Sequence, residues 1–207
     1  MEICEIFHSI QGEGTDIGLP TIFVRTSGCN LRCEWCDTSY AWEGGEDIDT
    51  REIKEKLDEI RCKRVCITGG EPLLQEETLD FINLLLPSYE ISLETNGSID
   101  ISEVVEKDLK VSMDYKPPSS KMQSKMRKDN LTLLRERDQL KFVISNEKDY
   151  EFSVDILKRF DPDCEVIFQA EESLDIQELS ESVLEDDLEI RVLPQLHKII
   201  WGDKEGV

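Results

Sequence analysis

The chain has 207 residues, a length that suits one domain with a substantial buried core. Charged residues make up 34% of it and apolar residues 39%, a balance that excludes a membrane-spanning or collagen-like protein. With 24 basic and 46 acidic residues the net charge is −22, and a surface this acidic repels nucleic acid and anionic membranes. We therefore expect no nucleic acid and no membrane as partner.

The first residues do not resemble a targeting sequence. They read Met1-Glu2-Ile3-Cys4-Glu5, without the cationic start and apolar run of a signal peptide. We therefore predict a cytoplasmic protein. In that reducing compartment the odd number of cysteines, seven, indicates thiols or metal ligands rather than a disulfide framework.

Segments typical of strands recur along the chain, and several are separated by segments with helical periodicity. In chain order, strands are predicted at residues 21–27, 64–68, 90–95, 109–115, 139–145, 164–169 and 189–193. Helices are predicted from three apolar stripes: Ile53, Leu57 and Ile60 behind a capping box at Asp49; Leu79, Ile82 and Leu86 before Pro87; and Ile176, Leu179 and Val183. Residues 112–127 contain few apolar side chains and are predicted to form an irregular functional loop.

Strands that alternate with helices favour parallel βαβ units. About six or seven strands in this length predict an α/β fold, an incomplete TIM-like barrel of about six parallel strands with a reduced set of helices. We expect it to form a single domain over residues 1–207. In such folds the chemistry takes place at the carboxyl ends of the strands, so the loops that follow strands are the candidate functional regions.

The loop after the first predicted strand contains Cys29, Cys33 and Cys36 in the spacing C-x3-C-x2-C. A structural zinc site normally has four protein ligands, and no fourth cysteine or histidine lies nearby in the sequence. A four-iron cluster held by three cysteines keeps one iron open for another ligand. The spacing favours such a cluster, with a zinc-binding loop as the alternative. The remaining cysteines lie in or beside apolar runs and are predicted to be structural thiols: Cys4, Cys62, Cys66 and Cys164.

Two further features follow or occupy predicted strands. The strand at 64–68 is followed by Gly69-Gly70-Glu71-Pro72, in which glycines allow close approach of the backbone to a ligand, although alone this run predicts only a turn. Residues 109–116 alternate between apolar side chains and the polar set Lys110, Ser112, Asp114 and Lys116. The polar set therefore shares one face of a strand, which fits either a site or the solvent-exposed face of an edge strand.

Taken together, these motifs resemble the radical SAM superfamily, and within it the 7-carboxy-7-deazaguanine synthase family. The cysteine triad and the Gly69 to Pro72 turn are typical of the superfamily. The narrower resemblance rests on motifs spread nearly from end to end: Gln11-Gly12-Glu13-Gly14, Glu94-Thr95-Asn96-Gly97, Asp114 to Ser120, Phe168-Gln169-Ala170 and Pro194 to Lys198. The resemblance implies the radical SAM type of partial TIM-like barrel.

The resemblance also implies an activity. Members of the family are lyases that convert 6-carboxy-5,6,7,8-tetrahydropterin to 7-carboxy-7-deazaguanine with release of ammonia, in the biosynthesis of 7-deazapurines such as queuosine and archaeosine. The implied cofactors are a 4Fe-4S cluster, S-adenosyl-L-methionine (SAM) and Mg²⁺, and the implied electron donor is a protein such as flavodoxin or ferredoxin. We expect a homodimer, and the apolar residues Ile199, Ile200 and Trp201 indicate either its interface or a cap on the core.

Site residues follow from the same resemblance. The cluster ligands are Cys29, Cys33 and Cys36, and Thr38 is the hydroxyl ligand of Mg²⁺, although the sequence alone predicts a capping or turn role for it. The expected substrate contacts are Ile10, Gln11, Gly12, Glu13, Arg25, Thr68 and His197. The expected SAM contacts are Trp35, Cys36, Asp37, Gly70, Glu71, Glu94, Asp114, Tyr115, Lys116, Gln169, Ala170, Glu171 and Glu172. No catalytic residue is expected beyond the cluster and SAM.

The expected substrate contacts suit the chemistry of a carboxylated pterin. The Arg25 guanidinium can hold a carboxylate bidentately, and Gln11 and Glu13 offer amide and carboxylate groups to the pterin edge. An ordinary ion pair is the alternative for Arg25 in a chain with 46 acidic residues. We assign no function to His8, and Trp42 and Trp201 are expected to pack in the core or at an interface.

Two other functions share parts of this pattern. A radical SAM activase, or another modifier of a macromolecule, would carry the same triad and glycine turn, although the small size and the lack of a docking domain weigh against it. A non-enzymatic zinc or iron–sulfur module is the second alternative.

Overall fold

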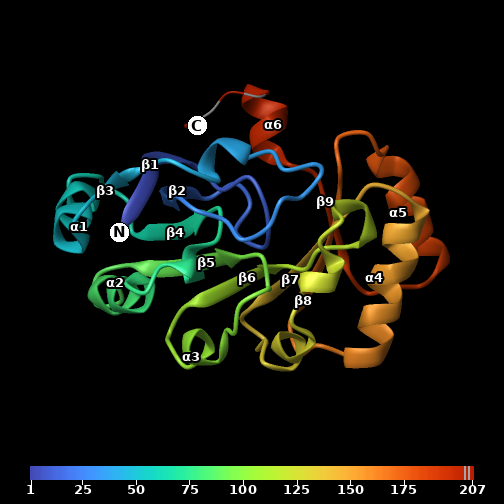
Figure 1. Cartoon of the computed structure of the whole chain (residues 1–207). Coiled ribbons are helices and arrows are strands. Elements are labelled where there is room, and N and C mark those ends of the chain that lie inside the picture. Colours follow the sequence, from blue (N-terminus) through green and yellow to red (C-terminus); the bar gives the residue numbers. More distant parts are fainter. Residues whose placement is uncertain (203, 205) are drawn as a thin grey trace.

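A computed structural model of the chain describes residues 1–202, 204, 206 and 207. Nine strands form one sheet in the order β3-β1-β2-β4-β5-β6-β7-β8-β9 (Figure 1). Their bounds are β1 Glu2–Ile10, β2 Pro20–Thr26, β3 Glu46–Asp47, β4 Arg64–Gly69, β5 Glu90–Thr95, β6 Lys110–Asp114, β7 Gln139–Ile144, β8 Glu165–Ala170 and β9 Arg191–Leu193. The predicted single domain covers residues 1–207, and positions 203 and 205 of it lie outside the described residues.

The sheet is mostly parallel and does not close. Each neighbouring pair from β2 to β9 is parallel, whereas β1 pairs antiparallel with β2 and with β3. The described sheet ends at β3 on one side and at β9 on the other. These strands confirm the predicted incomplete barrel, with seven parallel strands where we expected about six.

Most helices lie on the outside of the sheet, and the C-terminal helix stands apart from them at the top of the view (Figure 1). Their bounds are α1 Thr50–Asp58, α2 Thr78–Leu85, α3 Ser102–Val105, α4 Glu147–Phe160, α5 Ile176–Glu185 and α6 Leu196–Trp201. The three predicted stripes correspond to α1, α2 and α5, although Ile60 and Leu86 lie just beyond the ends of α1 and α2. The Asp49 side chain caps α1 by accepting from the backbone of Arg51. No helix within the described part of the chain has the length and apolar character needed to cross a membrane.

The longest helix was missed because its inner face is partly polar. α4 buries Asp149 and Ser153 beside Val154 and Ile156, so the apolar spacing of the sequence is interrupted. β1 was missed because most of its residues are only half-buried, which hides the strand alternation. The segment between β6 and β7 contains only short 3-10 turns, as predicted, but residues 112–114 belong to β6 and that part of the loop prediction is wrong.

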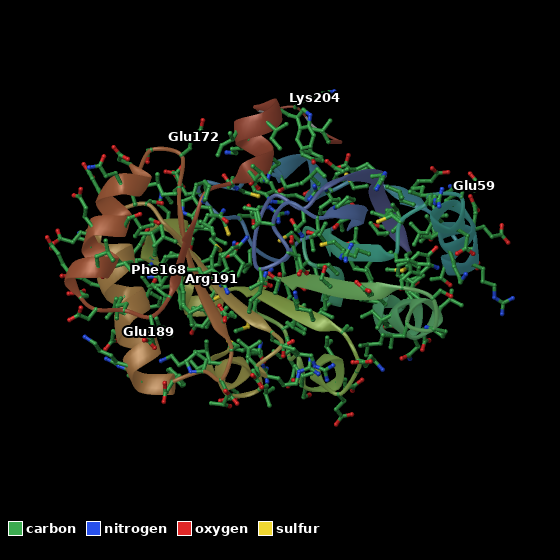
Figure 2. The ribbon with its side chains drawn as sticks, turned by 180° about the vertical axis from the view of Figure 1, so that it is seen from behind. Glu59, Phe168, Glu172, Glu189, Arg191 and Lys204 are labelled. Carbon is green, nitrogen blue, oxygen red and sulfur yellow. The ribbon has the colours of Figure 1, made fainter. Side chains whose placement is uncertain are left out.

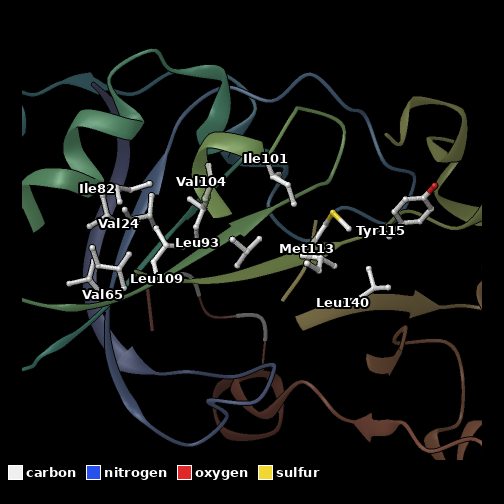
Figure 3. Close-up of a cluster of buried hydrophobic side chains, with 14 of the residues drawn as sticks. Val24, Val65, Ile82, Leu93, Ile101, Val104, Leu109, Met113, Tyr115 and Leu140 are labelled. Carbon is white, nitrogen blue, oxygen red and sulfur yellow. The ribbon is translucent and has the colours of Figure 1, made fainter. Parts of the chain in front are cut away.

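Strand alternation divides the sheet into an apolar outer face and a polar inner face. The outer face packs against α2 and α3, and Figure 3 shows Val24, Val65 and Leu93 from the strands beside Ile82 and Val104 from the helices. On the inner face Arg25 is in register with Thr68, and Asp114 with Lys141. β6 is a central strand, so its polar set lines the interior, and the edge-strand alternative is wrong.

The aromatic centre of the outer core provides a test of this packing. Phe142 is fully buried on β7, 5.7 Å from the ring centre of Phe168 and 5.8 Å from that of Tyr115. We expect Phe142→Ala to lower the free energy of unfolding by about 3–5 kcal/mol, because the change leaves a cavity. Phe142→Leu serves as the matched control and should cost less than half as much. Anaerobic urea unfolding followed by circular dichroism measures both, and an unchanged midpoint for the alanine variant would contradict the packing.

Candidate functional site

A cavity lies at the carboxyl ends of the parallel strands and receives side chains from both ends of the chain. The predicted site residues that line it are Ile10, Gln11, Gly12, Glu13, Arg25, Cys29, Cys33, Trp35, Cys36, Asp37, Thr38, Thr68, Gly70, Glu94, Asp114, Lys116, Gln169, Glu171, Glu172 and His197. Figure 2 shows Glu172 near α6, where its carboxylate lies 3.4 Å from the Lys198 ammonium. Residues far apart in the sequence are thus brought to one cavity.

Three predicted residues do not line the cavity: Glu71, Tyr115 and Ala170. Tyr115 is 1% exposed and packs in the outer core, near Phe142 and Phe152. Glu71 is fully buried and points at the backbone of neighbouring loops instead. Any contact of Tyr115 or Glu71 with a ligand in this cavity would therefore involve the backbone rather than the side chain.

The three cysteines of the triad are half-buried and lie in the loop that follows β2. Among the described residues, they do not form a group whose sulfur atoms all lie within 4.8 Å of one another. Four thiolates on one zinc ion lie closer than that, since each Zn–S bond is about 2.3 Å, whereas a four-iron cluster binds each thiolate to a different iron. The three sulfur atoms are therefore not arranged as a preformed site for a single zinc ion. Burial raises the pKa of the Cys33 thiol to about 11, so binding of iron must displace its proton.

The glycine turn after β4 packs against the cysteine loop. A Cβ on Gly70 would lie 2.2 Å from the Gly28 carbonyl oxygen and 2.8 Å from the Cys29 Cβ. Gly69 has a φ of +147°, and a Cβ there would meet the Thr26 backbone at 2.3 Å. These glycines are required because β2 and its loop approach the turn this closely, in addition to any role toward a ligand.

The Glu71 carboxylate fastens the ends of two strands together. It accepts hydrogen bonds from the Asn96 backbone at 2.7 Å, from the Leu73 backbone at 3.1 Å and from the Thr95 hydroxyl at 2.9 Å. Asn96 in turn directs its side-chain amide at the Cys29 sulfur, 3.9 Å away. Glu71 thus links the glycine turn to the loop after β5 and, through Asn96, to the cluster loop.

Two lysines and two carboxylates that line the cavity form a chain of ion pairs. The Lys141 ammonium forms an ion pair with Glu13 and lies 3.5 Å from Asp114, while Lys116 pairs with Asp114 at 2.9 Å and lies 4.8 Å above the Trp35 ring. Burial opposes the charge of Glu13, but Lys141 and the Gln195 amide hold its pKa well below its ordinary value. Glu13 is therefore ionised at neutral pH.

The two ends of the chain meet beside Glu13. The Leu196 backbone donates to the Gly12 carbonyl at 2.9 Å, and a Cβ on Gly12 would lie 2.1 Å from the His197 Nδ1 atom. Gln195 donates to Glu13 at 2.7 Å and to Asp37 at 3.3 Å. Glu13, Asp37 and His197 each offer one ligand atom within 4.8 Å of the others.

Arg25 lies on β2 at the side of the cavity. Its Nε atom donates to Glu5 at 2.7 Å, and its guanidinium lies 5.7 Å from the Phe7 ring and 5.8 Å from the Tyr40 ring. The expected alternative of an ion pair is thus present, but within a cavity wall rather than on the open surface. No hydrogen bond in the described structure uses its Nη groups, so they are left for a ligand.

Comparison with known proteins identifies the family. The radical SAM superfamily model matches residues 23–119. The protein named 7-carboxy-7-deazaguanine synthase of Thermoplasma acidophilum is 44% identical over the whole of both chains, and that of Koribacter versatilis is 38% identical over 97% of both. The chain belongs to the 7-carboxy-7-deazaguanine synthase family.

The fold agrees with this family. A crystal structure of QueE from Escherichia coli matches with a TM-score of 0.79 and covers 95% of this chain and 94% of that chain, at 23% identity. Membership of the radical SAM superfamily implies SAM and a 4Fe-4S cluster.

Several cavity residues were not among the predicted contacts. Lys141 is the most informative, because a lysine within the apolar strand sequence of β7 has to find a buried counter-charge. Gln195 lies in a motif that was quoted, without a role of its own. Phe7 and Phe23 stack at 4.9 Å on β1 and β2, and pairing of the missed strand β1 was needed to find them. Trp42, expected only to pack, also lines the cavity and carries the Arg32 guanidinium 4.8 Å from its ring centre.

The tight contact of Gly70 predicts a specific effect on the cluster. In a Gly70→Ala variant the new Cβ would overlap the Gly28 carbonyl, and the cysteine loop would have to move. We expect the anaerobically reconstituted variant to lose most of its iron, measured as iron and sulfide per chain. Gly18→Ala is the control, since its φ is +88° but nothing lies within 4 Å, which leaves only a backbone strain of about 1 kcal/mol. Full iron content in Gly70→Ala would contradict the close packing.

Glu71 predicts a pH dependence of stability. Desolvation raises its pKa from 4.5 to about 7, although the three hydrogen bonds that it accepts act in the opposite direction and lower the pKa. A carboxyl whose pKa is raised on folding contributes its full stability below pH 4.5 and loses it as the pH rises through 7, here by about 3 kcal/mol. Relative to a Glu71→Gln variant, wild-type protein should therefore become less stable from pH 4.5 to 8. Urea unfolding measures the difference, and the exposed Glu103→Gln variant is the control. A difference that does not change with pH would refute the assignment.

Proposed function

We propose that this protein converts 6-carboxy-5,6,7,8-tetrahydropterin to 7-carboxy-7-deazaguanine with release of ammonia, as a carbon–nitrogen lyase that depends on SAM, a 4Fe-4S cluster and Mg²⁺. One observation carries the proposal: the cysteine triad lines the same cavity as Gln11, Gly12, Glu13, Arg25 and His197. The names of the relatives support the reaction. The proposed pathway is the biosynthesis of 7-deazapurines such as queuosine.

At the cluster end the proposed SAM contacts combine charge with an aromatic face. Asp114 and Lys116 present a carboxylate and an ammonium side by side, beside Trp35, which suits the amino and carboxylate groups of an amino acid. The other proposed SAM contacts that line the cavity are Asp37, Gly70, Glu94, Gln169, Glu171 and Glu172, of which Glu94 and Gln169 also bond to the proposed substrate contacts Gln11, Thr68 and Glu13. When bound, the cluster and SAM supply the radical that removes a hydrogen atom from the substrate.

At the other end the chain's own residues would orient the substrate. The free Nη groups of Arg25 suit the substrate carboxylate, because Glu5 already occupies Nε and fixes the plane of the guanidinium. Glu13, held ionised by Lys141, accepts from N–H groups of the pterin edge, and Gln11 and Thr68 lie beside it. His197 covers Gly12 and completes the enclosure.

The proposed Mg²⁺ site is at Thr38, near the substrate end. The Thr38 hydroxyl donates to Asp37 at 2.7 Å, so a hydroxyl and a carboxylate lie together as hard oxygen donors. The nearby group of Glu13, Asp37 and His197 supports a site for a divalent cation in this corner. There, the ion would bind Thr38, substrate oxygens and water.

We further propose that residues 1–207 form one catalytic domain that works in the cytoplasm as a homodimer, with a flavodoxin or ferredoxin as electron donor and no nucleic acid or membrane partner. The dimer proposal rests on α6, where Ile199 is 68% exposed and Ile200 48%. Contact of these two apolar side chains with a second copy of the chain would remove them from water, which is favourable even for a chain with a net charge of −22.

The decisive experiment is an anaerobic product assay. Reconstituted protein with dithionite, SAM, Mg²⁺ and the carboxylated tetrahydropterin should release 7-carboxy-7-deazaguanine, detected by mass spectrometry. Cys33→Ala should abolish SAM cleavage, because a cluster ligand is lost. Arg25→Ala should still cleave SAM but use the substrate about 100-fold less efficiently, since a bidentate charged contact of about 2–3 kcal/mol is removed.

The control for Arg25 is Arg51→Ala, an exposed arginine on α1 that lies outside the cavity. Turnover by the Cys33 variant would refute the cluster assignment. SAM cleavage without a pterin product, under every condition, would favour the activase alternative. Bound zinc with no response to SAM would favour the metal-binding module.

A further inference from the structure

Two long stretches of the sequence beside the triad contain no acidic residue, although Glu34 and Asp37 lie in the cysteine loop itself. The two longest stretches without Asp or Glu are residues 17–33, which lead into the cysteine loop, and residues 115–128. The second stretch carries five basic residues: Lys116, Lys121, Lys125, Arg127 and Lys128. The chain has 46 acidic and 24 basic residues, so this segment has a charge opposite to that of the chain as a whole.

The basic segment, residues 120–128, is fastened to the cluster loop at both of its ends. At one end the Ser120 carbonyl accepts from the Glu34 backbone at 3.3 Å, and Lys121 pairs with Glu34 at 2.8 Å, directly after Cys33. At the other end the Arg127 backbone donates to the Gly97 carbonyl at 3.1 Å, next to Asn96, whose amide reaches the Cys29 sulfur. The segment thus borders the triad on the side of Cys29 and Cys33.

Much of the positive charge of the segment is available to a partner. The side chains of Lys121 and Arg127 are 66% and 45% exposed, even though each has an acidic neighbour. Lys125 and Lys128 are exposed, and neither has an ion-pair partner in the described part of the chain. Surface lysines without counter-charges act mainly at long range, on the approach of another charged molecule.

We propose that the basic segment is the docking surface for a small, acidic one-electron carrier protein that reduces the cluster. Because the whole chain carries a net charge of −22 while residues 120–128 carry only basic charges, an acidic partner is attracted to this segment against a repulsive background. Attraction to Lys125 and Lys128 would orient such a partner toward the triad. In the transfer the carrier loses one electron and the cluster gains it, and no bond is made or broken. The inference rests on the proposed cluster and not on the identity of the substrate.

The test measures reduction of the cluster rather than turnover. Reduced flavodoxin is mixed anaerobically with the holoenzyme in a stopped-flow instrument at low ionic strength, and bleaching of the cluster absorbance gives the bimolecular rate. Lys125→Glu combined with Lys128→Glu should lower this rate by about 10-fold or more, because long-range attraction becomes repulsion. Reduction and SAM cleavage driven by dithionite should not change. Salt should slow the wild-type reaction toward the rate of the variant.

The matched control reverses two charges at the opposite edge of the sheet. Arg61 precedes β4 and Lys158 lies in the last turn of α4, before β8, and both are exposed. Arg61→Glu combined with Lys158→Glu changes the net charge by the same amount and should affect the rate far less. Lys125→Gln combined with Lys128→Gln should give an intermediate rate.

Three outcomes would overturn the proposal. One is an unchanged rate in the Lys125 and Lys128 variants, and another is an equal loss in the control pair, which would indicate net charge alone. The third is tight binding of a single-stranded RNA 20-mer that the variants lose while the reduction rate stays the same, which would assign the surface to nucleic acid. None of these readouts involves the pterin product, so failure here is distinguishable from failure of the proposed reaction.

Discussion

The polar interior of the half-barrel depends on one buried ammonium group, that of Lys141. It pairs with Glu13 on one side and lies 3.5 Å from Asp114 on the other, with only 9% of its side-chain surface exposed. Removing one member of such a buried group leaves an uncompensated charge, at a cost of about 3–5 kcal/mol. Glu13 belongs to the proposed substrate end and Asp114 to the proposed SAM end. The two ends of the cavity therefore form one electrostatic unit, whose centre is a residue that we assign to neither ligand.

Close backbone contacts hold the loops that surround this unit. Gly12 lies against His197, and Gly70 lies against the Gly28 carbonyl, in both cases nearer than any Cβ allows. Glycine motifs at such sites are usually interpreted as space for a ligand. Here the same glycines also pack one part of the chain against another, and the Gly12 contact joins the two ends of the chain. A loop fixed in this way can position cluster and substrate residues without relying on flexible side chains.

The sequence was a good guide to the parallel strands and to the face that each presents, because β-branched and apolar runs alternate with polar residues at a period of two. That alternation placed Ser112, Asp114 and Lys116 on one face before the sheet was known. The inner partners were harder to find, since Lys141 pairs with Glu13 across 128 positions of sequence and only the strand order brings them together. β1 and α4 escaped detection for a related reason, as both carry polar residues on faces that tertiary contacts partly bury. Hydrophobic periodicity identifies a face that apolar partners bury, and it does not identify polar residues that are buried against polar partners.

Charge distribution connects the fold to electron supply. Reduction adds one negative charge to a cluster, so carboxylates close to it would make the added electron less favourable, and the effect is strongest within a Debye length of about 8–10 Å. Residues 17–33 and 115–128 contain no acidic residue, although Glu34 and Asp37 lie within the cysteine loop. The same arrangement attracts an anionic carrier and eases the arrival of its electron. An acidic surface is thus combined in one small protein with a basic segment beside the cluster loop, and the ammonium groups of Lys116 and Lys121 pair with Asp114 and Glu34, two of the carboxylates close to the triad.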